Sequence, residues 1–126
     1  MESTTVVEIS YEEAMSRFKH LYIQEKLPTN NPINSRWFAT EFACGCLVRV
    51  NKKVARIKGT IVFNEWRGHG FGEQLVLHRI NLAAKEKYEK IEVYSRHPKW
   101  YLKNGFVERR VTSWGVVVLE KDLNGG

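Results

Sequence analysis

One stretch of the sequence combines residue types that can bind a phosphorylated ligand. Three glycines and an arginine lie between an apolar segment and an amphipathic one, in the run Arg67-Gly68-His69-Gly70-Phe71-Gly72. Glycines let backbone N–H groups approach a ligand closely, and the start of a helix favours negative charge. The run therefore predicts a strand, a pyrophosphate-binding turn and a helix. An ordinary glycine-rich turn between a strand and a helix would show the same pattern.

Two cysteines are the next candidates for chemistry. Cys44 and Cys46 stand two residues apart in an apolar run, so on a strand their side chains would share one face and a disulfide between them would be strained. A metal site would need more ligands, and the four histidines lack metal-ligand spacing: His20, His69, His78 and His97. We therefore expect two buried free thiols and no metal.

The length and composition of the chain fit a single globular domain spanning residues 1–126. The net charge of +6 is uneven, because residues 1–30 carry −2 and residues 31–126 carry +8. A basic main body suits an anionic partner such as nucleic acid or a phosphorylated cofactor, or serves solubility alone. No apolar run approaches the roughly 18 residues of a membrane helix, and no signal peptide is evident. We expect a cytoplasmic protein without a membrane partner.

The N-terminal half of the sequence predicts a strand, a helix and a hairpin. Residues 4–9 are β-branched and predict a strand, and Ser10 with Glu13 forms a capping box before an amphipathic helix over about residues 11–26. A polar loop follows over residues 28–35. Strand-forming residues then extend from 37 to 50, with Gly45 marking a bulge, and a second strand over 54–63 completes a hairpin. The apolar end of that second strand predicts burial on both faces.

The C-terminal half predicts two helices, a strand and a second hairpin. A helix from about 70 to 88 carries an apolar stripe, and its basic residues fall mostly off that stripe: Arg79, Lys85 and Lys87. Residues 90–94 alternate as in a strand. A short helix over 97–104 has Pro98 in its first turn and Gly105 as its C-cap. Residues 106–112 and 116–119 predict a closing hairpin, with Trp114 at its tip.

In this order of elements the chain resembles the GNAT N-acetyltransferase superfamily. One motif is the acetyl-CoA signature of the family, here Arg67, Gly70 and Gly72, with Val62 five residues before the arginine. The other is the run Trp100-Tyr101-Leu102-Lys103-Asn104-Gly105-Phe106. The resemblance covers about residues 41–120. It implies an α/β (α+β) fold with a mixed, mostly antiparallel central sheet flanked by helices, and acetyl-CoA (acyl-CoA) as co-substrate without a metal.

The resemblance also implies roles for particular residues. The backbone of residues 67–72 would bind the pyrophosphate, and Ile61 and Val62 would pair with the pantetheine arm. An acceptor amine would attack the thioester directly, and Tyr101 would protonate the departing thiolate as general acid. A tyrosine is protonated at neutral pH because its ordinary pKa is near 10. The alternative for Tyr101 is that its ring packs the short helix against the sheet.

The general base and the acceptor stay open at this stage. Residues 54–63 hold no acidic residue, so Glu41, Glu92, His97 or a chain of waters could accept the proton of the amine. Only a loop over 28–38 follows the first helix, where many family members have a second helix that shapes the acceptor pocket.

Basic residues tilt the acceptor toward a large or anionic molecule, such as protein, tRNA or a DNA base, over a small amine. These residues are Arg36, Arg49, Lys52, Lys53, Arg56 and Lys58. The alternative function is a non-catalytic GNAT-like module that binds nucleic acid or protein. Trp114 is either an interface anchor or a residue that folds back onto the sheet, and the oligomeric state cannot be read from the sequence.

Overall fold

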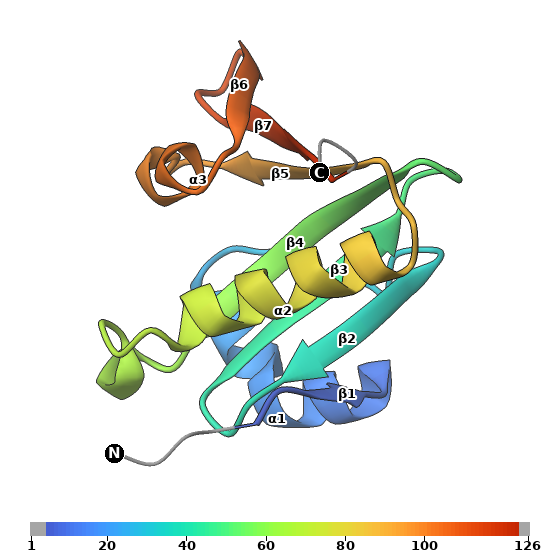
Figure 1. Cartoon of the computed structure of the whole chain (residues 1–126). Helices are drawn as coiled ribbons and strands as arrows, with labels where there is room; N and C mark the ends of the chain where they lie inside the picture. The colour runs from blue at the N-terminus through green and yellow to red at the C-terminus, as the bar shows by residue number, and fades with distance from the viewer. Residues whose placement is uncertain (1–4, 124–126) are drawn as a thin grey trace.

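A computed structural model describes residues 5–123, which form a seven-stranded sheet with helices on both faces (Figure 1). The strand order is β1-β2-β3-β4-β5-β7-β6. The elements are β1 (Val7–Ile9), α1 (Tyr11–Gln24), β2 (Ser35–Ala39), β3 (Ala43–Arg49), β4 (Val54–Val62), the 3-10 turn η1 (Asn64–Trp66), α2 (Phe71–Lys85), β5 (Lys90–Ser95), α3 (Lys99–Lys103), β6 (Val107–Val111) and β7 (Val117–Asp122). The mixed, mostly antiparallel sheet and the closing hairpin confirm the expected fold class. Thr4, expected in the first strand, lies outside the described residues.

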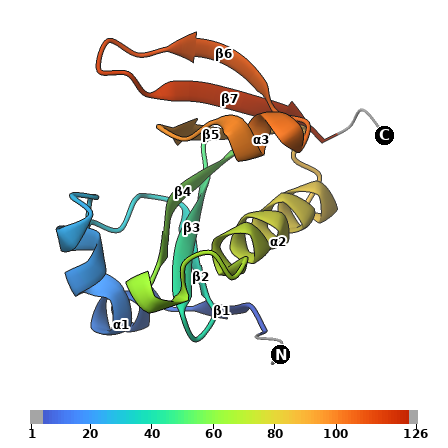
Figure 2. The ribbon, with the colours of Figure 1, turned by 90° about the vertical axis from the view of Figure 1, so that its left-hand side faces the viewer.

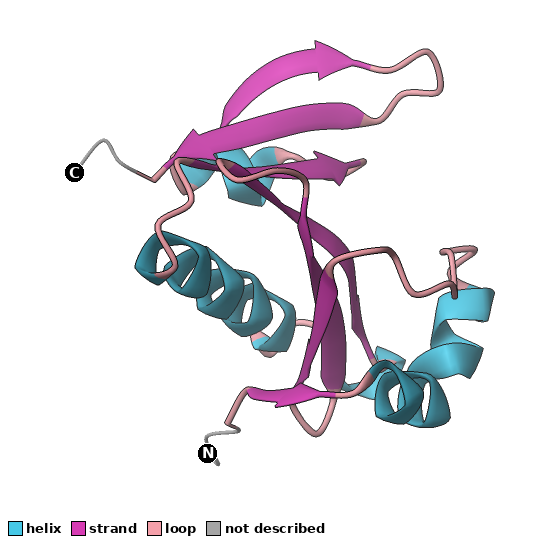
Figure 3. Cartoon of the chain, turned by 90° about the vertical axis from the view of Figure 1, so that its right-hand side faces the viewer, coloured by secondary structure: helices cyan, strands magenta, loops and turns pink. Residues whose placement is uncertain are grey.

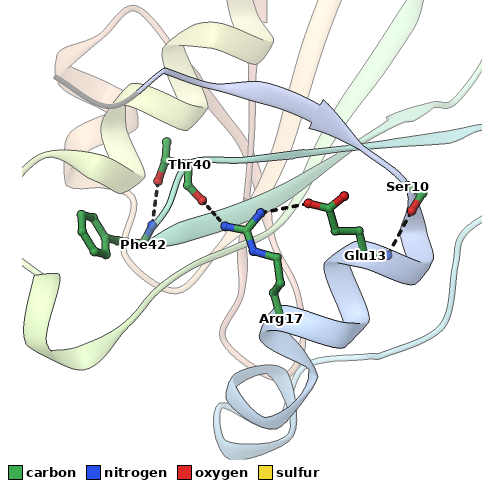
Figure 4. Close-up of polar contacts among 5 residues, drawn as sticks. All are labelled: Ser10, Glu13, Arg17, Thr40 and Phe42. Atoms are coloured by element: carbon green, nitrogen blue, oxygen red, sulfur yellow. Dashed lines mark hydrogen bonds and ion pairs between the residues drawn. The ribbon is translucent and has the colours of Figure 1, made fainter.

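Helix α1 begins at the predicted capping box. The Ser10 hydroxyl accepts a hydrogen bond from the Glu13 N–H (3.0 Å), which satisfies one of the free donors at the helix start (Figure 4). Arg17 then pairs with Glu13 (3.3 Å) and donates to the Thr40 carbonyl (2.7 Å). The Thr40 hydroxyl in turn accepts from the Phe42 N–H (3.1 Å). These bonds fix α1 to the turn that follows β2.

That turn corrects the prediction of one strand over residues 37–50. Residues 40–42 reverse the chain, so β2 and β3 form an antiparallel pair in which Ala39 lies opposite Cys44. The segment contains no glycine or proline at the reversal, and the Thr40 side chain takes the place of such a residue by binding the backbone two positions on. The expected hairpin of this strand with β4 is present as the β3–β4 pair.

The helices bury the two faces of the sheet separately. Figures 2 and 3 show α1 and α2 on opposite sides of β2, β3 and β4. Cys44 and Cys46 are buried on the α1 face as free thiols, as predicted. Burial raises the pKa of each thiol to about 11, although the Arg79 cation opposes that rise.

A bulge interrupts the β3–β4 pairing where the sequence places Gly45. Cys44 lies opposite Ile61 and Cys46 opposite Lys58, so two β4 residues, Gly59 and Thr60, face Gly45. The bulge is confirmed, with its extra residue on β4. Such a bulge bends a strand and increases its twist.

Beyond the bulge, β4 leaves its other neighbour. Among the described residues β4 and β5 make the one parallel pairing, and it runs over four residue pairs from Val54–Lys90 to Ile57–Val93. Figure 2 shows β5, β7 and β6 turning away from β2, β3 and β4. Val62 and Phe63 are half-buried rather than buried on both faces, because no strand covers this end of β4 on the β5 side. The sheet therefore opens into a V.

In the C-terminal hairpin of β6 and β7, Glu120 connects neighbouring strands. Its carboxylate accepts from Arg109 of β6 (2.7 Å) and from Lys90 of β5 (3.2 Å). Trp114 stands at the tip of the hairpin and is 64% exposed.

Candidate functional site

The opening between β4 and β5 holds a cleft of about 490 Å³. Thr60, Ile61 and Val62 of β4 line one side, and Trp100 and Tyr101 of α3 line the other. The start of α2 closes one end. The bulge and the short β4–β5 ladder together create this cleft. The ladder ends at the Ile57–Val93 pair, and beyond it β4 and β5 diverge while each strand continues.

The glycine turn enters α2 with two residues in the left-handed conformation. Gly68 has a φ of +82° and Gly70, the N-cap of α2, a φ of +85°, which other residues adopt only with strain. A Cβ at either position would meet no atom within 4 Å, so the space above the turn is open. The first helical bond runs from the Gln74 N–H to the Gly70 carbonyl (2.9 Å), and the N–H groups before it precede the helical ladder. The turn is therefore shaped to receive an anion.

Residues of the predicted cradle divide into two groups. Arg67 and Gly72 line the cleft, and a Cβ at Gly72 would approach Val62 Cγ2 to 3.3 Å, which shows how closely α2 packs on β4. His69 and Phe71 instead join an aromatic cluster around Trp66. The Trp66 ring stacks on the Phe42 ring, with 3.9 Å between the ring centroids. Only backbone groups of His69 and Phe71 can therefore serve the predicted cradle.

Arg67 is held by a residue that the sequence did not indicate. Its guanidinium pairs with the Glu25 carboxylate at the C-terminus of α1 and donates to the Val62 carbonyl (3.4 Å). Glu25 and Arg67 are 42 residues apart, and both line the cleft. No local pattern links them, so the pair is visible only in the fold.

Tyr101 lines the cleft from the middle of the five-residue helix α3. Its ring makes edge contacts with Trp100 and Phe106, each at 5.2 Å between ring centroids. Burial raises the pKa of Tyr101, and the nearby Arg79 cation partly opposes that rise. The phenol is thus protonated at neutral pH and can donate a proton or a hydrogen bond into the cleft.

The comparisons with known proteins agree with this geometry. A family model described as an acetyltransferase (GNAT) domain matches residues 33–108. The chain belongs to the GNAT acetyltransferase family. No curated protein matches the sequence.

Solved structures of other GNAT proteins share the whole fold. A GNAT family acetyltransferase from Elizabethkingia anophelis with acetyl-CoA bound has a TM-score of 0.71 at 16% identity, covering 97% of this chain and 99% of that one. The IAA acetyltransferase from Bacillus cereus ATCC 14579 has a TM-score of 0.72 at 16% identity, covering 95% and 99%. An acetyltransferase of the GNAT family from Staphylococcus aureus Mu50 has a TM-score of 0.72 at 13% identity, covering 97% and 100%. At these identities the likeness establishes the fold.

Two further features are absent from residues 5–123. No helix in this part of the GNAT chain is long and apolar enough to cross a membrane. No group of three or more His, Cys, Asp or Glu side chains within it is arranged to hold a metal ion.

The structure sorts the three residues expected as general bases. Glu41 is exposed on the turn between β2 and β3, and the cleft lining does not include it. Glu92 pairs with Arg56 (2.6 Å) and does not line the cleft. His97 lines the same cleft as Tyr101. Glu25, which the sequence did not suggest, lines it as well.

A second, larger cavity of about 1030 Å³ adjoins the cleft on the α1 side. Tyr101, His97 and Glu25 line both cavities. Of the six basic residues expected at the acceptor side, Arg56 and Lys58 line this cavity. The other four are not in its lining: Arg36, Arg49, Lys52 and Lys53, of which Arg36 instead pairs with Glu8 and Glu86.

Proposed function

We propose that this GNAT protein is an acetyl-CoA-dependent N-acetyltransferase in which an acceptor amine attacks the thioester directly. One observation carries the proposal. Two neighbouring strands diverge beside an open glycine turn at a helix N-terminus, and a protonated tyrosine, Tyr101, lines the resulting cleft.

The cleft suits the co-substrate in charge and shape. Backbone N–H groups of residues 67–72 and the positive end of α2 would bind the pyrophosphate, in the open space left by Gly68 and Gly70. Arg67 would add a charge-assisted hydrogen bond. Ile61 and Val62 lie on the part of β4 that β5 leaves unpaired, so their backbone groups would pair with the pantetheine arm.

Each proton in the reaction has a candidate residue. The amine nitrogen forms a bond to the thioester carbon, the carbon–sulfur bond then breaks, and the Tyr101 hydroxyl would donate its proton to the departing thiolate. The proton released by the amine would pass to His97 or Glu25, which line both cavities, or to water. A backbone N–H would stabilise the oxyanion that forms between these two steps.

The acceptor is proposed to be large or anionic, such as a protein, tRNA or a DNA base. The second cavity is about twice the volume of the cleft and is lined by basic side chains from several elements: Lys26, Arg56, Lys58 and Arg96. Trp114, exposed at the hairpin tip, and Tyr94 add flat apolar surfaces at the same cavity. Basic and aromatic groups together suit a nucleobase with its phosphates.

Titration of acetyl-CoA by calorimetry tests the proposal. We expect saturable binding, weakened at least about tenfold by Arg67→Glu, because an acid would then face the pyrophosphate. Arg67→Gln serves as the matched control, since it removes the charge without reversing it. No binding by the wild-type protein at millimolar acetyl-CoA would refute the enzyme proposal and leave a non-catalytic binding module.

The chemical step and the acceptor need separate experiments. Tyr101→Phe is expected to leave acetyl-CoA affinity unchanged and to slow turnover by about a hundredfold; unchanged turnover would remove Tyr101 from the mechanism. Mass spectrometry of tRNA, DNA and protein fractions after incubation with labelled acetyl-CoA would identify the acceptor class.

A further inference from the structure

Arg79 is a fully buried cation in the middle of the molecule. It extends from α2 with an exposed fraction of 0%, and its guanidinium makes four hydrogen bonds. The acceptors are the carbonyls of Leu75 (3.0 Å), Cys46 (2.9 Å) and Lys58 (3.2 Å) and the hydroxyl of Thr60 (2.6 Å). The sequence predicted the opposite, since Arg79 was expected off the buried stripe of its helix.

No carboxylate compensates this charge within the part of the chain that the structure describes. The ion pairs of residues 5–123 do not include Arg79. The ionisable groups that act on it most are two phenols and two thiols, Tyr101, Tyr22, Cys46 and Cys44, all neutral at pH 7. His78, whose pKa is lowered by burial and then by the Arg79 charge, lies near it as well. Burying an uncompensated charge is costly, and a guanidinium does not lose its proton in proteins. A positive charge is therefore fixed at this point at a cost to stability.

The guanidinium occupies the bulge between β3 and β4. Gly45 leaves room for it, because a Cβ at that position would lie 2.6 Å from Arg79 Nη1. Tyr22 holds the same bulge from the α1 side by donating to the Gly59 carbonyl (2.6 Å). Arg79 and Tyr22 thus bind the distorted part of β4 from its two faces.

The Arg79 guanidinium donates a hydrogen bond to a residue of the cleft wall, Thr60. Thr60, which accepts a hydrogen bond from Arg79, lines both cavities, and so does Tyr101. Burial raises the pKa of Tyr101, and the Arg79 charge partly opposes that rise. In a buried site the field of a fixed charge is screened far less than in water. Negative charge that develops between Thr60 and Tyr101 would be stabilised by it.

We propose that Arg79 is a positioning residue for acyl transfer, which fixes the β4 bulge and supplies the positive field under the reacting thioester. The inference rests on the proposed acetyltransferase function. It assigns to Arg79 both the shape of the floor of the cleft and the stabilisation of the oxyanion and thiolate that form above it.

The test compares Arg79→Lys, which keeps the charge, with Arg79→Gln, which removes it. Tyr22→Phe is the control, because it deletes a bond to the same bulge without changing any charge. The first measurement follows the titration of the Tyr101 phenol by NMR of carbon-labelled tyrosine, assigned with Tyr101→Phe, and needs neither acetyl-CoA nor an acceptor. The second measures acetyl-CoA affinity and turnover with the acceptor fraction found by mass spectrometry.

The proposal expects Tyr101 to titrate at higher pH in Arg79→Gln, and near its wild-type value in Arg79→Lys and Tyr22→Phe. Turnover should fall at least about tenfold in Arg79→Gln and be largely restored by lysine, with acetyl-CoA affinity within about twofold of wild type. If Arg79→Gln does not fold, Thr60→Val tests the positioning role alone, because it removes one hydrogen bond of Arg79 and keeps the charge; its turnover loss must then exceed that of Tyr22→Phe.

Several results would overturn the proposal. Equal titration of Tyr101 in Arg79→Gln and Arg79→Lys, or equal turnover losses in Arg79→Gln and Tyr22→Phe, would make Arg79 a structural anchor only. Loss of the fold in both Arg79 variants would do the same. Absence of acetyl-CoA binding by the wild-type protein is a different failure, because it refutes the proposed function while the titration still reports whether the Arg79 charge reaches Tyr101.

Discussion

Replacing Glu25 with glutamine is expected to tighten acetyl-CoA binding about fourfold. Glu25 pairs with Arg67 at the edge of the cleft, and the two side chains are 37% and 49% exposed. A pair this exposed is worth about 0.5 kcal/mol after screening. Glutamine removes the pair and thereby frees the Arg67 guanidinium for the pyrophosphate.

The same substitution also removes repulsion between the carboxylate and the ligand. One charge about 10 Å from two phosphate charges in water, screened at physiological salt, costs about 0.3 kcal/mol. The sum of about 0.8 kcal/mol corresponds to the fourfold gain. Calorimetry at low and high salt measures it, and the gain should shrink as salt rises.

Glu73 provides the matched control for this experiment. It lines the same cleft from the first turn of α2, and the ion pairs of residues 5–123 do not include it. Glu73→Gln removes a charge without releasing Arg67, so we expect a gain below about twofold. Equal gains in the two variants, or no gain in Glu25→Gln, would refute the reasoning that Arg67 is withheld from the ligand by Glu25.

Three further predictions concern stability and reactivity. Burial raises the pKa of Glu120, but hydrogen bonds from Arg109 and Lys90 lower it by more, so that the net pKa is below its ordinary value. Its stabilisation is therefore present above its ordinary pKa of 4.5 and lost as pH falls through the lower folded-state value. In denaturant titrations, Glu120→Gln should lower the free energy of unfolding by ~0.5–1 kcal/mol at pH 7, and the difference from wild type should shrink as pH falls below 4.5. Gly45→Ala should cost ~2 kcal/mol in the same assay, because the new methyl group overlaps the Arg79 guanidinium; an unchanged midpoint would mean that the bulge yields easily. Cys44 and Cys46, with a pKa of about 11 each, should resist iodoacetamide at pH 8 until the protein unfolds, as mass spectrometry would show; rapid native labelling would contradict their burial.

Local chemistry explains what the sequence predicted well. Ser10 and Glu13 cap α1 through atoms three residues apart. Gly70 at the start of α2 and Gly105 adopt the left-handed conformation, although Gly105 follows the C-cap of α3, Asn104, and is not itself that cap. Each of these features depends on neighbours in the chain, so the pattern of residue types contains most of the information. The observed helices are still shorter than predicted by up to three residues at one end; α2, for example, ends at Lys85 and was predicted to reach about residue 88.

Contacts between distant segments explain what could not be predicted. A turn at Thr40 depends on a side chain bonding to backbone within an unbroken run of strand-forming residues, so the run looked continuous. The Glu25–Arg67 pair joins the end of α1 to the turn before α2, 42 residues along the chain. Arg79 is buried because Gly45 leaves a space for it across the sheet. Helical spacing places position 79 on the same stripe as Leu75 and Ala83, but a charged side chain is rarely fully buried, so residue type argued for the surface.

The short β4–β5 ladder makes the molecule a pair of lobes with one hinge. One lobe runs to the end of β4 and the other begins at β5, and four residue pairs join these two strands. The hydrophobic cluster on the α1 face contains residues of the first lobe, none beyond Phe63. The cluster on the α2 face contains side chains from both lobes, including Leu119. A small rotation about the ladder would thus be braced by the cluster under α2, and on the α1 side by the contacts of Arg56 with Glu92 and Tyr94. It would change the width of the cleft without breaking a hydrogen bond inside either lobe. The width of the cleft is therefore a property of the hinge, whereas the Glu25–Arg67 pair lies within the lobe that contains α1 and β4.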